Sequence, residues 1–306
     1  MRGNKSNSRV RLAVLSLVGL LVLCILFLNF ELSESVSNTV GLSQKTDSID
    51  FALPDSNISR AIYLNLKSAI AVDNKSGEVI YCYNAGSVRP IASLSKLLSV
   101  MIIYDKYNPE QVITINKKDA YRSSRSLFRV GDKVTAKDLL HASLLRSDNR
   151  ATRALARTVS GSIENFVNEM NDRAEKLGLE DTKMYDPTGL DEHNCSSAAD
   201  CVRLINAMIL NYPELARISR LKKYNLKPVN RKTSKRLINT NKMVFSKYDV
   251  IAGKTGYIIE SDYCLATVLE NDKGEQITVV VLGSPGSNTR FREARRLANY
   301  AFRQIG

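Results

Sequence analysis

Tryptophan is absent from this 306-residue sequence, and only two histidines occur, His141 and His193. The five cysteines form no Cys-x-x-Cys pair. Because protein zinc sites are built mainly from cysteine and histidine, the chain has almost nothing from which to build one. The sequence also shows no internal repeat and no motif typical of RNA or DNA binding. We therefore expect no metal, no other cofactor and no nucleic-acid partner.

Residues 12–30 contain no charged side chain and follow a basic segment, residues 1–11, which has four Lys or Arg and no acid. At about 1.5 Å per residue, a helix over 12–30 would span roughly 28 Å, close to the hydrocarbon thickness of a bilayer. A cleaved signal peptide is the alternative, although its apolar stretch is usually shorter and ends in small residues. We predict a transmembrane signal anchor, with residues 1–11 in the cytoplasm and the rest exported.

The Ser-, Asn- and Thr-rich residues 31–59 are predicted to be a linker, and residues 60–306 a folded domain in the cell envelope. This domain would face the outer side of the cytoplasmic membrane, whether that side is periplasmic or extracellular. Acidic residues are absent from 217–247, a stretch with eleven Lys or Arg. A run of like charge is usually a solvated surface. In an exported protein it could also attract the polyanionic wall or membrane surface.

Export would also place Cys82, Cys195, Cys201 and Cys264 where they could oxidise. Cys195 and Cys201 are close enough in sequence to close a short loop. Buried thiols are the simpler interpretation, and the pairing stays open.

Strand patterns lie at both ends of the domain, and helical patterns lie between them. Residues 68–84 read as a hairpin with a turn at 73–77. Further strands are expected at 250–259, 263–270 and 276–282. Apolar spacing predicts helices at 93–104, 136–145, 149–159, 162–177, 197–210 and 289–302. These patterns favour an α+β fold: an antiparallel sheet made from both ends and flanked by helices, plus an all-helical subdomain.

Ser93 and Lys96 stand three residues apart at the start of the first predicted helix. Positions at this spacing lie on one helix face, so the hydroxyl and the amine can meet. A serine hydroxyl is a weak nucleophile until a neighbouring base takes its proton. Lys96 can act as that base only if burial and nearby cations lower its pKa. Taken alone, the spacing is common, and Ser93 would more often be a helix cap.

Two further polar runs are candidates for the same site. The Ser-Asp-Asn run at 147–149 lies between two predicted helices, where Ser147 could relay a proton and Asn149 could hold a peptide carbonyl. The Lys-Thr-Gly run at 254–256 lies in a predicted strand, and its glycine would let a substrate backbone approach closely. Alone, the first run is an ordinary loop and cap signal, and the second an ordinary strand-end turn.

Together the three runs match, in order, the S-x-x-K, S-D-N and K-T-G motifs of penicillin-recognising serine enzymes. Beyond these motifs, nearly all of residues 60–306 resembles the low-molecular-mass penicillin-binding proteins, the D-alanyl-D-alanine carboxypeptidases and endopeptidases. The likeness is also carried by Val88-Arg89-Pro90-Ile91-Ala92, Phe128-Arg129-Val130-Gly131-Asp132, Leu177-Gly178-Leu179 with Thr182, Asp186-Pro187-Thr188-Gly189-Leu190, Ser197-Ala198 with Asp200, and Gly253 and Tyr257.

The resemblance implies a β-lactamase/transpeptidase-like fold with an active-site cleft between sheet and helical subdomain. It implies a D,D-peptidase catalytic domain at 60–306 that cuts D-alanyl bonds in peptidoglycan peptides. By this resemblance Ser93 forms an acyl-enzyme, Lys96 is the base, and Ser147 also takes part in catalysis. The implied substrate-binding residues are Asn149, Lys254, Thr255, Gly256 and Tyr257. The backbone N–H groups of Ser93 and Tyr257 would hold the oxyanion, and β-lactams would be covalent inhibitors.

One position bears on the choice within this family. The carboxypeptidase branch often has Asn-Arg-Asn before the Lys-Thr-Gly strand, and its arginine helps to receive a terminal carboxylate. Here the segment reads Asn239-Thr240-Asn241. A threonine lacks the planar fork of arginine, so a free C-terminus should be recognised less well. This favours an endopeptidase that cuts cross-links, with a carboxypeptidase as the alternative.

Two other functions remain open. A β-lactamase would need a glutamate in an E-x-x-L-N element some thirty residues after the Ser-Asp-Asn run, and no such element occurs near Lys183. We therefore expect slow release of bound penicillin. A non-catalytic peptidoglycan-binding scaffold would have no need to retain Ser93, Lys96 and Lys254 together.

Overall fold

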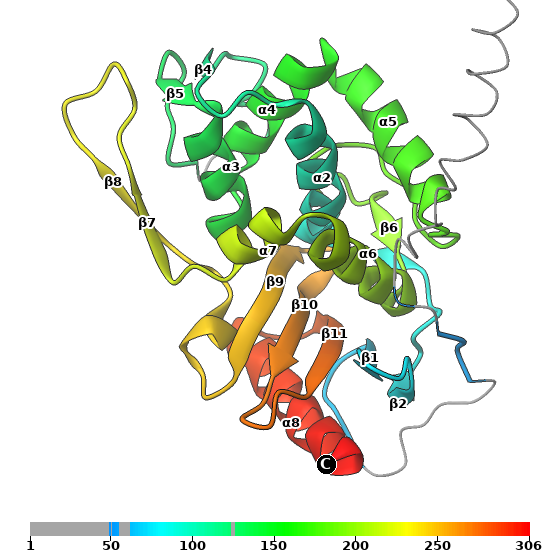
Figure 1. The fold of residues 1–306 in the computed structure, drawn as a ribbon. Coiled ribbons are helices and arrows are strands. Elements are labelled where there is room, and N and C mark those ends of the chain that lie inside the picture. Colours follow the sequence, from blue (N-terminus) through cyan, green and yellow to red (C-terminus); the bar gives the residue numbers. More distant parts are fainter. Residues whose placement is uncertain (1–48, 50, 55–61, 124–125) are drawn as a thin grey trace, which may run out of the picture. The chain divides into compact units, whose positions relative to one another are not determined.

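The structure is a computed structural model that describes residues 49, 51–54, 62–123 and 126–306 (Figure 1). Its main sheet has five antiparallel strands in the order β2-β1-β11-β10-β9. These strands are β1 (Ser68–Asp73), β2 (Val79–Tyr83), β9 (Asp249–Ile258), β10 (Asp262–Glu270) and β11 (Gln276–Ser284). The N-terminal hairpin pairs with the last strand through β1 and β11. This confirms the predicted sheet made from the two ends of the domain.

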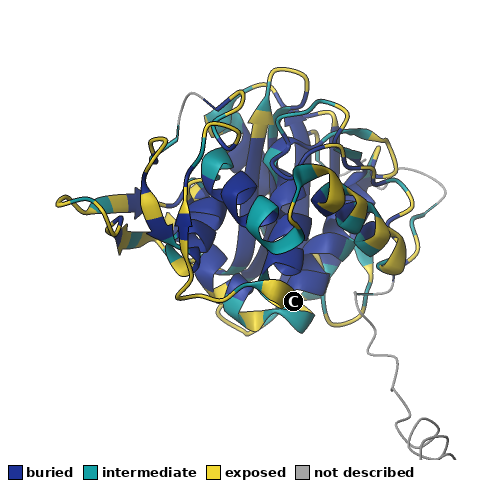
Figure 2. Cartoon of the chain, turned by 90° about the horizontal axis from the view of Figure 1, so that it is seen from above, coloured by how far each residue is buried: buried dark blue, intermediate teal, exposed yellow. Residues whose placement is uncertain are grey.

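Alternation along the strands gives the sheet two apolar faces. In β1, Ala69 and Ala71 pack with the C-terminal helix α8 (Ser287–Ile305), whereas Ile70 and Val72 belong to the core shared with the helical layer. All four side chains are fully buried. Successive strand residues point to opposite faces, so a sheet covered on both sides needs apolar residues at consecutive positions. Figure 2 shows this buried centre beneath a more exposed periphery.

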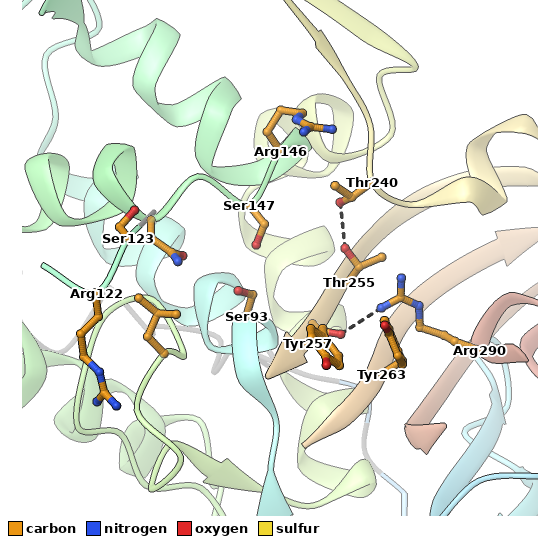
Figure 3. A pocket seen from close by; sticks show the side chains of 13 residues that line it. Ser93, Arg122, Ser123, Arg146, Ser147, Thr240, Thr255, Tyr257, Tyr263 and Arg290 are labelled. Atoms are coloured by element: carbon orange, nitrogen blue, oxygen red, sulfur yellow. Dashed lines mark hydrogen bonds between the residues drawn. The ribbon is translucent and has the colours of Figure 1, made fainter. Parts of the chain in front are cut away.

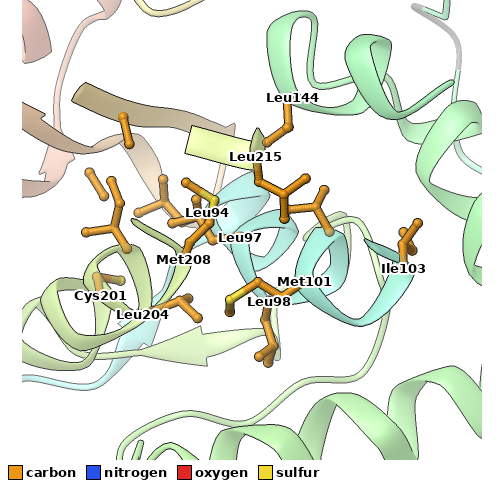
Figure 4. Close-up of a cluster of buried hydrophobic side chains, with 14 of the residues drawn as sticks. Leu94, Leu97, Leu98, Met101, Ile103, Leu144, Cys201, Leu204, Met208 and Leu215 are labelled. Atoms are coloured by element: carbon orange, nitrogen blue, oxygen red, sulfur yellow. The ribbon is translucent and has the colours of Figure 1, made fainter. Parts of the chain in front are cut away.

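The helical layer packs around the buried helix α2 (Lys96–Lys106). The other helices of this layer are α3 (Ala136–Leu145), α4 (Asn149–Ser160), α5 (Ile163–Lys176), α6 (Ala198–Asn211) and α7 (Pro213–Ser219). Leu97 and Met101 of α2 meet Leu204 and Met208 of α6 in the cluster drawn in Figure 4. Each such side chain contributes about 1.5–3 kcal/mol by leaving water. This packing fixes α2 relative to the sheet and so positions its N-terminal end.

Four helices of this layer begin directly after a residue whose side chain caps the helix. Thr135, Asp148, Ser162 and Ser197 each accept a hydrogen bond from a backbone N–H in the first turn of α3, α4, α5 and α6. These caps satisfy N–H groups that have no partner within the helix. The predicted helix at 93–104 begins differently, because Ala92–Ser95 form a 3-10 turn, η1, before α2 starts at Lys96. Ser93 is therefore not an α-helix cap.

Several short elements were not predicted. They are α7, the paired strands β3 (Arg89–Pro90) and β6 (Cys195–Ser196), β4 (Val112–Thr114) and β5 (Lys133–Thr135), and β7 (Lys223–Leu226) and β8 (Lys235–Ile238). The basic stretch 217–247 contains the β7–β8 hairpin, which extends beside α3 in Figure 1. The exposed cations of the stretch are Arg217, Arg220, Lys222, Lys223, Lys227, Lys232, Arg236, Lys242 and Lys247. Much of the stretch thus forms a solvated basic surface.

The structure also bears on the N-terminal region and the cysteines. Phe51, within the predicted linker, is buried, and the Arg203 guanidinium lies 4.6 Å from its ring centroid. Within the described ranges, no helix is both long and apolar enough to cross a bilayer. The predicted anchor at 12–30 lies outside those ranges. The four described cysteines are free thiols, and all but Cys195 are buried.

Candidate active site

Ser93 and Lys96 meet at the junction of η1 and α2. The Lys96 amine donates to the Ser93 hydroxyl over 3.0 Å, to Asn149 Oδ1 over 2.7 Å and to the Thr188 carbonyl over 2.6 Å. These three acceptors account for all three N–H bonds of an ammonium group. Ser93 itself donates to the same Thr188 carbonyl over 3.2 Å. The geometry places the hydroxyl beside a buried amine whose orientation is fixed.

A loop held by Asp186 presents the Thr188 carbonyl. The Asp186 carboxylate accepts from the Thr188 hydroxyl at 2.5 Å and from the backbone N–H of Gly189 at 2.7 Å. It also pairs with Arg153 at 3.0 Å, and both side chains are buried. Hydrogen bonds to an ionised group are the stronger kind, so this loop is well anchored.

The Ser-Asp-Asn run crosses from α3 to α4. Ser147 has a positive φ of 55°, a left-handed conformation that costs a non-glycine residue about 1–2 kcal/mol. Asp148 caps α4 and accepts from the backbone N–H of Leu127 at 2.8 Å. Its role is therefore to hold the loop. With the turn fixed in this way, the Ser147 hydroxyl points into the cavity in Figure 3.

The Lys-Thr-Gly run lies on β9, the edge strand of the sheet. The Lys254 amine donates to the Ser147 hydroxyl over 2.8 Å and to the Thr255 carbonyl over 2.8 Å. The Thr255 and Thr240 hydroxyls lie 2.8 Å apart. The amine of Lys254 thus joins the sheet side of the cleft to the helical side.

Burial controls the protonation of both lysines. It lowers the pKa of Lys96 from 10.5 to about 7, although the nearby carboxylates of Asp186 and Asp148 act in the opposite direction. Burial also lowers the pKa of Lys254, and there the cationic neighbours Lys96 and Arg290 lower it further. Loss of water disfavours a charged amine. A lysine near pKa 7 is able to take a proton at neutral pH.

Two glycines let both sides of the cleft approach the Ala92–Ser93 peptide. Gly189 has φ +76°, and a Cβ there would lie 1.9 Å from the Ala92 carbonyl oxygen. A Cβ on Gly256 would lie 2.7 Å from the Ile91 carbonyl oxygen and 3.2 Å from Ser93 N. Only glycine fits such close backbone approaches. They bring the 256–257 backbone next to the N–H of Ser93.

These residues surround one pocket of about 400 Å³. Ser93, Ser147, Asn149, Thr255, Gly256 and Tyr257 line it, whereas Lys96 and Lys254 are buried behind its surface. All eight predicted site residues therefore come together, and their chemical roles remain predictions. Leu190 and Thr240, which the sequence analysis named for the family resemblance, also line the pocket. The lining residues that it did not single out are Arg122, Ser123, Arg146, Tyr263 and Arg290.

Some of the missed residues carried no recognisable signal. Thr188 acts through its backbone carbonyl, which any residue could provide, and only the family resemblance of residues 186–190 pointed to this segment. Arg290 resembles an ordinary residue of α8, yet its guanidinium donates to the carbonyls of Gly256 and Cys264 at 2.9 and 3.0 Å. Arg146 stands next to Ser147 in the sequence, so adjacency could have identified it.

The described residues also include one group with potential metal-ligand atoms, Asp191, Glu192 and His193. These atoms lie within 4.8 Å of one another, and His193 Nδ1 contacts Asp191 Oδ1 at 2.8 Å. Exposed groups of this kind are common without a metal. The expectation of a metal-free site stays a prediction.

Comparison with known proteins places this site in a family. The family model for D-alanyl-D-alanine carboxypeptidases matches residues 56–286. D-alanyl-D-alanine endopeptidases of Pseudomonas aeruginosa and Escherichia coli are 33% and 31% identical to the chain, each match covering 76% of both proteins. A D-alanyl-D-alanine carboxypeptidase of Bacillus subtilis is 28% identical, over 83% of this chain and 66% of its own.

The solved structure of the Streptomyces K15 DD-transpeptidase superposes with a TM-score of 0.73 at 26% identity, covering 79% of this chain and 98% of that protein. The fold expected from the resemblance is thereby confirmed. The chain belongs to the D-alanyl-D-alanine carboxypeptidase family and is a serine D,D-peptidase with the transpeptidase fold.

Proposed function

We propose that this protein cleaves D-alanyl peptide bonds of peptidoglycan through an acyl-enzyme on Ser93, and that cross-links are its preferred substrate. The observation that carries the proposal is the 3.0 Å contact between the Ser93 hydroxyl and the buried Lys96 amine at the pocket. The lowered pKa of Lys96, about 7, supports its role as the base.

Acylation follows from the hydrogen bonds of Lys96. When this amine is neutral, two N–H bonds remain on Asn149 Oδ1 and the Thr188 carbonyl, and its lone pair faces Ser93. The Ser93 oxygen attacks the D-alanyl carbonyl carbon while its proton passes to Lys96 Nζ. Negative charge on the former carbonyl oxygen would be held by the backbone N–H groups of Ser93 and Tyr257. The close approach of Gly256 to Ser93 N supports this pairing.

Collapse of the tetrahedral intermediate breaks the C–N bond and requires a proton on the leaving amine. Ser147 is suited to pass that proton, because it points into the pocket and is hydrogen-bonded to Lys254. Water then attacks the ester carbonyl and frees Ser93. A β-lactam would acylate Ser93 in the same way, and we expect its slow release.

The preference for cross-links is supported by two observations. Position 240 is threonine, and its hydroxyl contacts Thr255. The endopeptidases of Pseudomonas aeruginosa and Escherichia coli share 33% and 31% identity with this chain, against 28% for the Bacillus subtilis carboxypeptidase. Carboxypeptidase activity is the alternative.

The uncharged stretch at 12–30 supports an anchored domain in the cell envelope.

Labelling with a fluorescent penicillin tests the nucleophile. Wild type should become covalently labelled and Ser93→Ala should not, whereas Ser234→Ala, an exposed serine on the β7–β8 hairpin, should label like wild type. Equal labelling of Ser93→Ala would overturn the assignment. A wild type that binds peptidoglycan without labelling would favour a scaffold, and rapid multiple turnover of the β-lactam would favour a β-lactamase.

Digestion of purified peptidoglycan tests the preferred bond. Cross-linked dimers should turn into monomers at a higher rate than pentapeptides shorten to tetrapeptides, as followed by chromatography and mass spectrometry. The opposite order of rates would make the protein a carboxypeptidase.

A further inference from the structure

Arg146 is one of three arginines that line the pocket. It directly follows α3 as the C-cap residue, is exposed, and lines the pocket beside Ser147 and Thr240 (Figure 3). Its hydrogen bond from Nη1 to the Ile238 carbonyl is long at 3.5 Å. Among the described residues, no carboxylate lies within ion-pair distance of its guanidinium.

The other two arginines of the lining are less well placed for an anion beside Thr240 and Thr255. Arg290 is buried, and its Nη1 donates to the carbonyls of Gly256 and Cys264. Arg122 is exposed, but in Figure 3 its guanidinium lies on the far side of Ser93 from Thr240 and Thr255. Arg146 is thus the arginine of the lining best placed to bind an anion beside Thr240 and Thr255.

The hydroxyls of Thr240 and Thr255 face the same part of the pocket. The backbone N–H of Thr240 donates to the Leu145 carbonyl at 2.9 Å, and its hydroxyl donates to the same oxygen at 3.2 Å. These bonds tie the segment after β8 to the residue directly before Arg146. The guanidinium and the Thr240–Thr255 pair, 2.8 Å apart at their oxygens, are thereby held together by α3, the segment after β8, and β9.

A D,D-peptide supplies the matching anion. On the leaving side of the scissile bond, a cross-link between two D-centres has a D-residue whose carboxylate is close to the reacting amide. A guanidinium and a carboxylate form a planar, charge-assisted pair. Position 240 holds no arginine, but a guanidinium from the end of α3 reaches the same neighbourhood.

We propose that Arg146 determines specificity by binding the substrate carboxylate next to the scissile bond, together with the Thr240 and Thr255 hydroxyls. This inference rests on the proposed function and deepens it. The guanidinium stands at the pocket surface, where water is displaced only when a substrate enters. Its contribution is therefore to substrate binding and orientation, and the proton transfers remain with Lys96 and Ser147.

The test compares benzylpenicillin with its methyl ester, in which a methyl group caps the carboxylate and removes its charge. Second-order acylation rate constants are measured for wild type, Arg146→Gln and Arg146→Lys. Because a hydrogen bond to a charged group contributes about 1.5–3 kcal/mol, wild type should prefer the acid by about 10- to 100-fold. Arg146→Gln should lose most of this preference, and the ester rate should stay within about twofold of wild type. Arg146→Lys should keep part of it.

The ester rate is an internal control for folding, and Arg295→Gln, an exposed arginine on α8, is the matched control. Equal loss of acid and ester rates in Arg146→Gln would mean a structural role and overturn the inference. An unchanged acid preference would overturn it as well. A wild type that neither compound acylates would instead refute the acyl-enzyme on Ser93 and, with it, this subsite.

Discussion

The two walls of the cleft each contain a buried lysine, yet the surroundings of the two amines differ. Lys96, on the helical wall, has the carboxylates of Asp186 and Asp148 as neighbours, which limit the fall in its pKa. Lys254, on the sheet wall, has Lys96 and Arg290, which lower its pKa further. Both amines are buried, and the charges beside them differ in sign.

The two amines also differ in the hydroxyl group that each one contacts. Lys96 contacts Ser93 directly, whereas Lys254 contacts Ser147 across the cleft. The comparison indicates that one amine activates the nucleophile and the other orients a second hydroxyl and favours an anionic substrate. The following predictions are ways to test that division.

Replacement of each lysine should have the largest effect. Lys96→Met should slow acylation by penicillin about 10²–10⁴-fold, the usual range for loss of a proton-transfer group, and Lys254→Met should slow it less. Only Lys96→Met should also remove the rise in rate with pH near 7, because it removes the base. Stopped-flow acylation at several pH values measures both effects. A pH-independent Lys254→Met alongside a pH-dependent Lys96→Met would reverse the roles.

Alanine at Gly189 should be the next most damaging change. Its Cβ would lie 1.9 Å from the Ala92 carbonyl oxygen, and it would also have φ +76°. Gly161→Ala is the matched control, because Gly161 has φ +76° as well but a Cβ added there would meet nothing within 4 Å. The control should lose about 1–2 kcal/mol from its left-handed backbone, and Gly189→Ala about 1–3 kcal/mol more.

Urea unfolding monitored by circular dichroism measures these free energies. Gly189→Ala should also slow acylation, since the Ala92–Ser93 peptide must shift to accommodate the methyl group. Equal losses of stability in the two variants would show that this contact does not constrain the nucleophile.

The pH profile of wild type should reflect Lys96. Below its pKa of about 7 the amine is protonated and has no lone pair, so the acylation rate should rise about tenfold per pH unit. Above that value the rate should level off. A rate that falls as pH rises through 7 would contradict a lysine base with a lowered pKa.

Asp186→Asn should shift this profile modestly. It removes the carboxylate that raises the pKa of Lys96, so the midpoint should move to lower pH. The midpoint is independent of the fraction of folded enzyme, which matters because the change also breaks the buried pair with Arg153. Asp272→Asn, an exposed carboxylate, is the control. A shift to higher pH would exclude Asp186 as the source of the effect.

The spacing of apolar residues predicted most of the longer helices and strands, but it missed the short ones. The helix expected at 136–145 matches α3, and the strands expected at 250–259 and 263–270 match β9 and β10 within one residue at each end. The β7–β8 hairpin and α7 escaped prediction, because a short element leaves few positions in which a period can appear. The 3-10 turn at Ser93 escaped it too, because the same apolar residues suit either kind of helix.

The residues of the site also fall into two groups, those that the sequence motifs identified and those that only the structure revealed. The order of the three motifs placed Ser93, Ser147 and Lys254 in one enzyme family. The motifs carried no sign of the Thr188 carbonyl, the tie between Leu145 and Thr240, or the position of Arg146. These features depend on contacts between residues that are far apart in the chain.

By itself, the sequence determined the apolar alternation of the strands, the helix caps and the three motifs, since these depend on residue types at short spacing. Only the tertiary structure decided that the Lys96 amine is buried beside two carboxylates and the Lys254 amine beside two cations. The pKa of an amine depends on water and charge within a few ångströms, and folding brings those groups from distant parts of the chain.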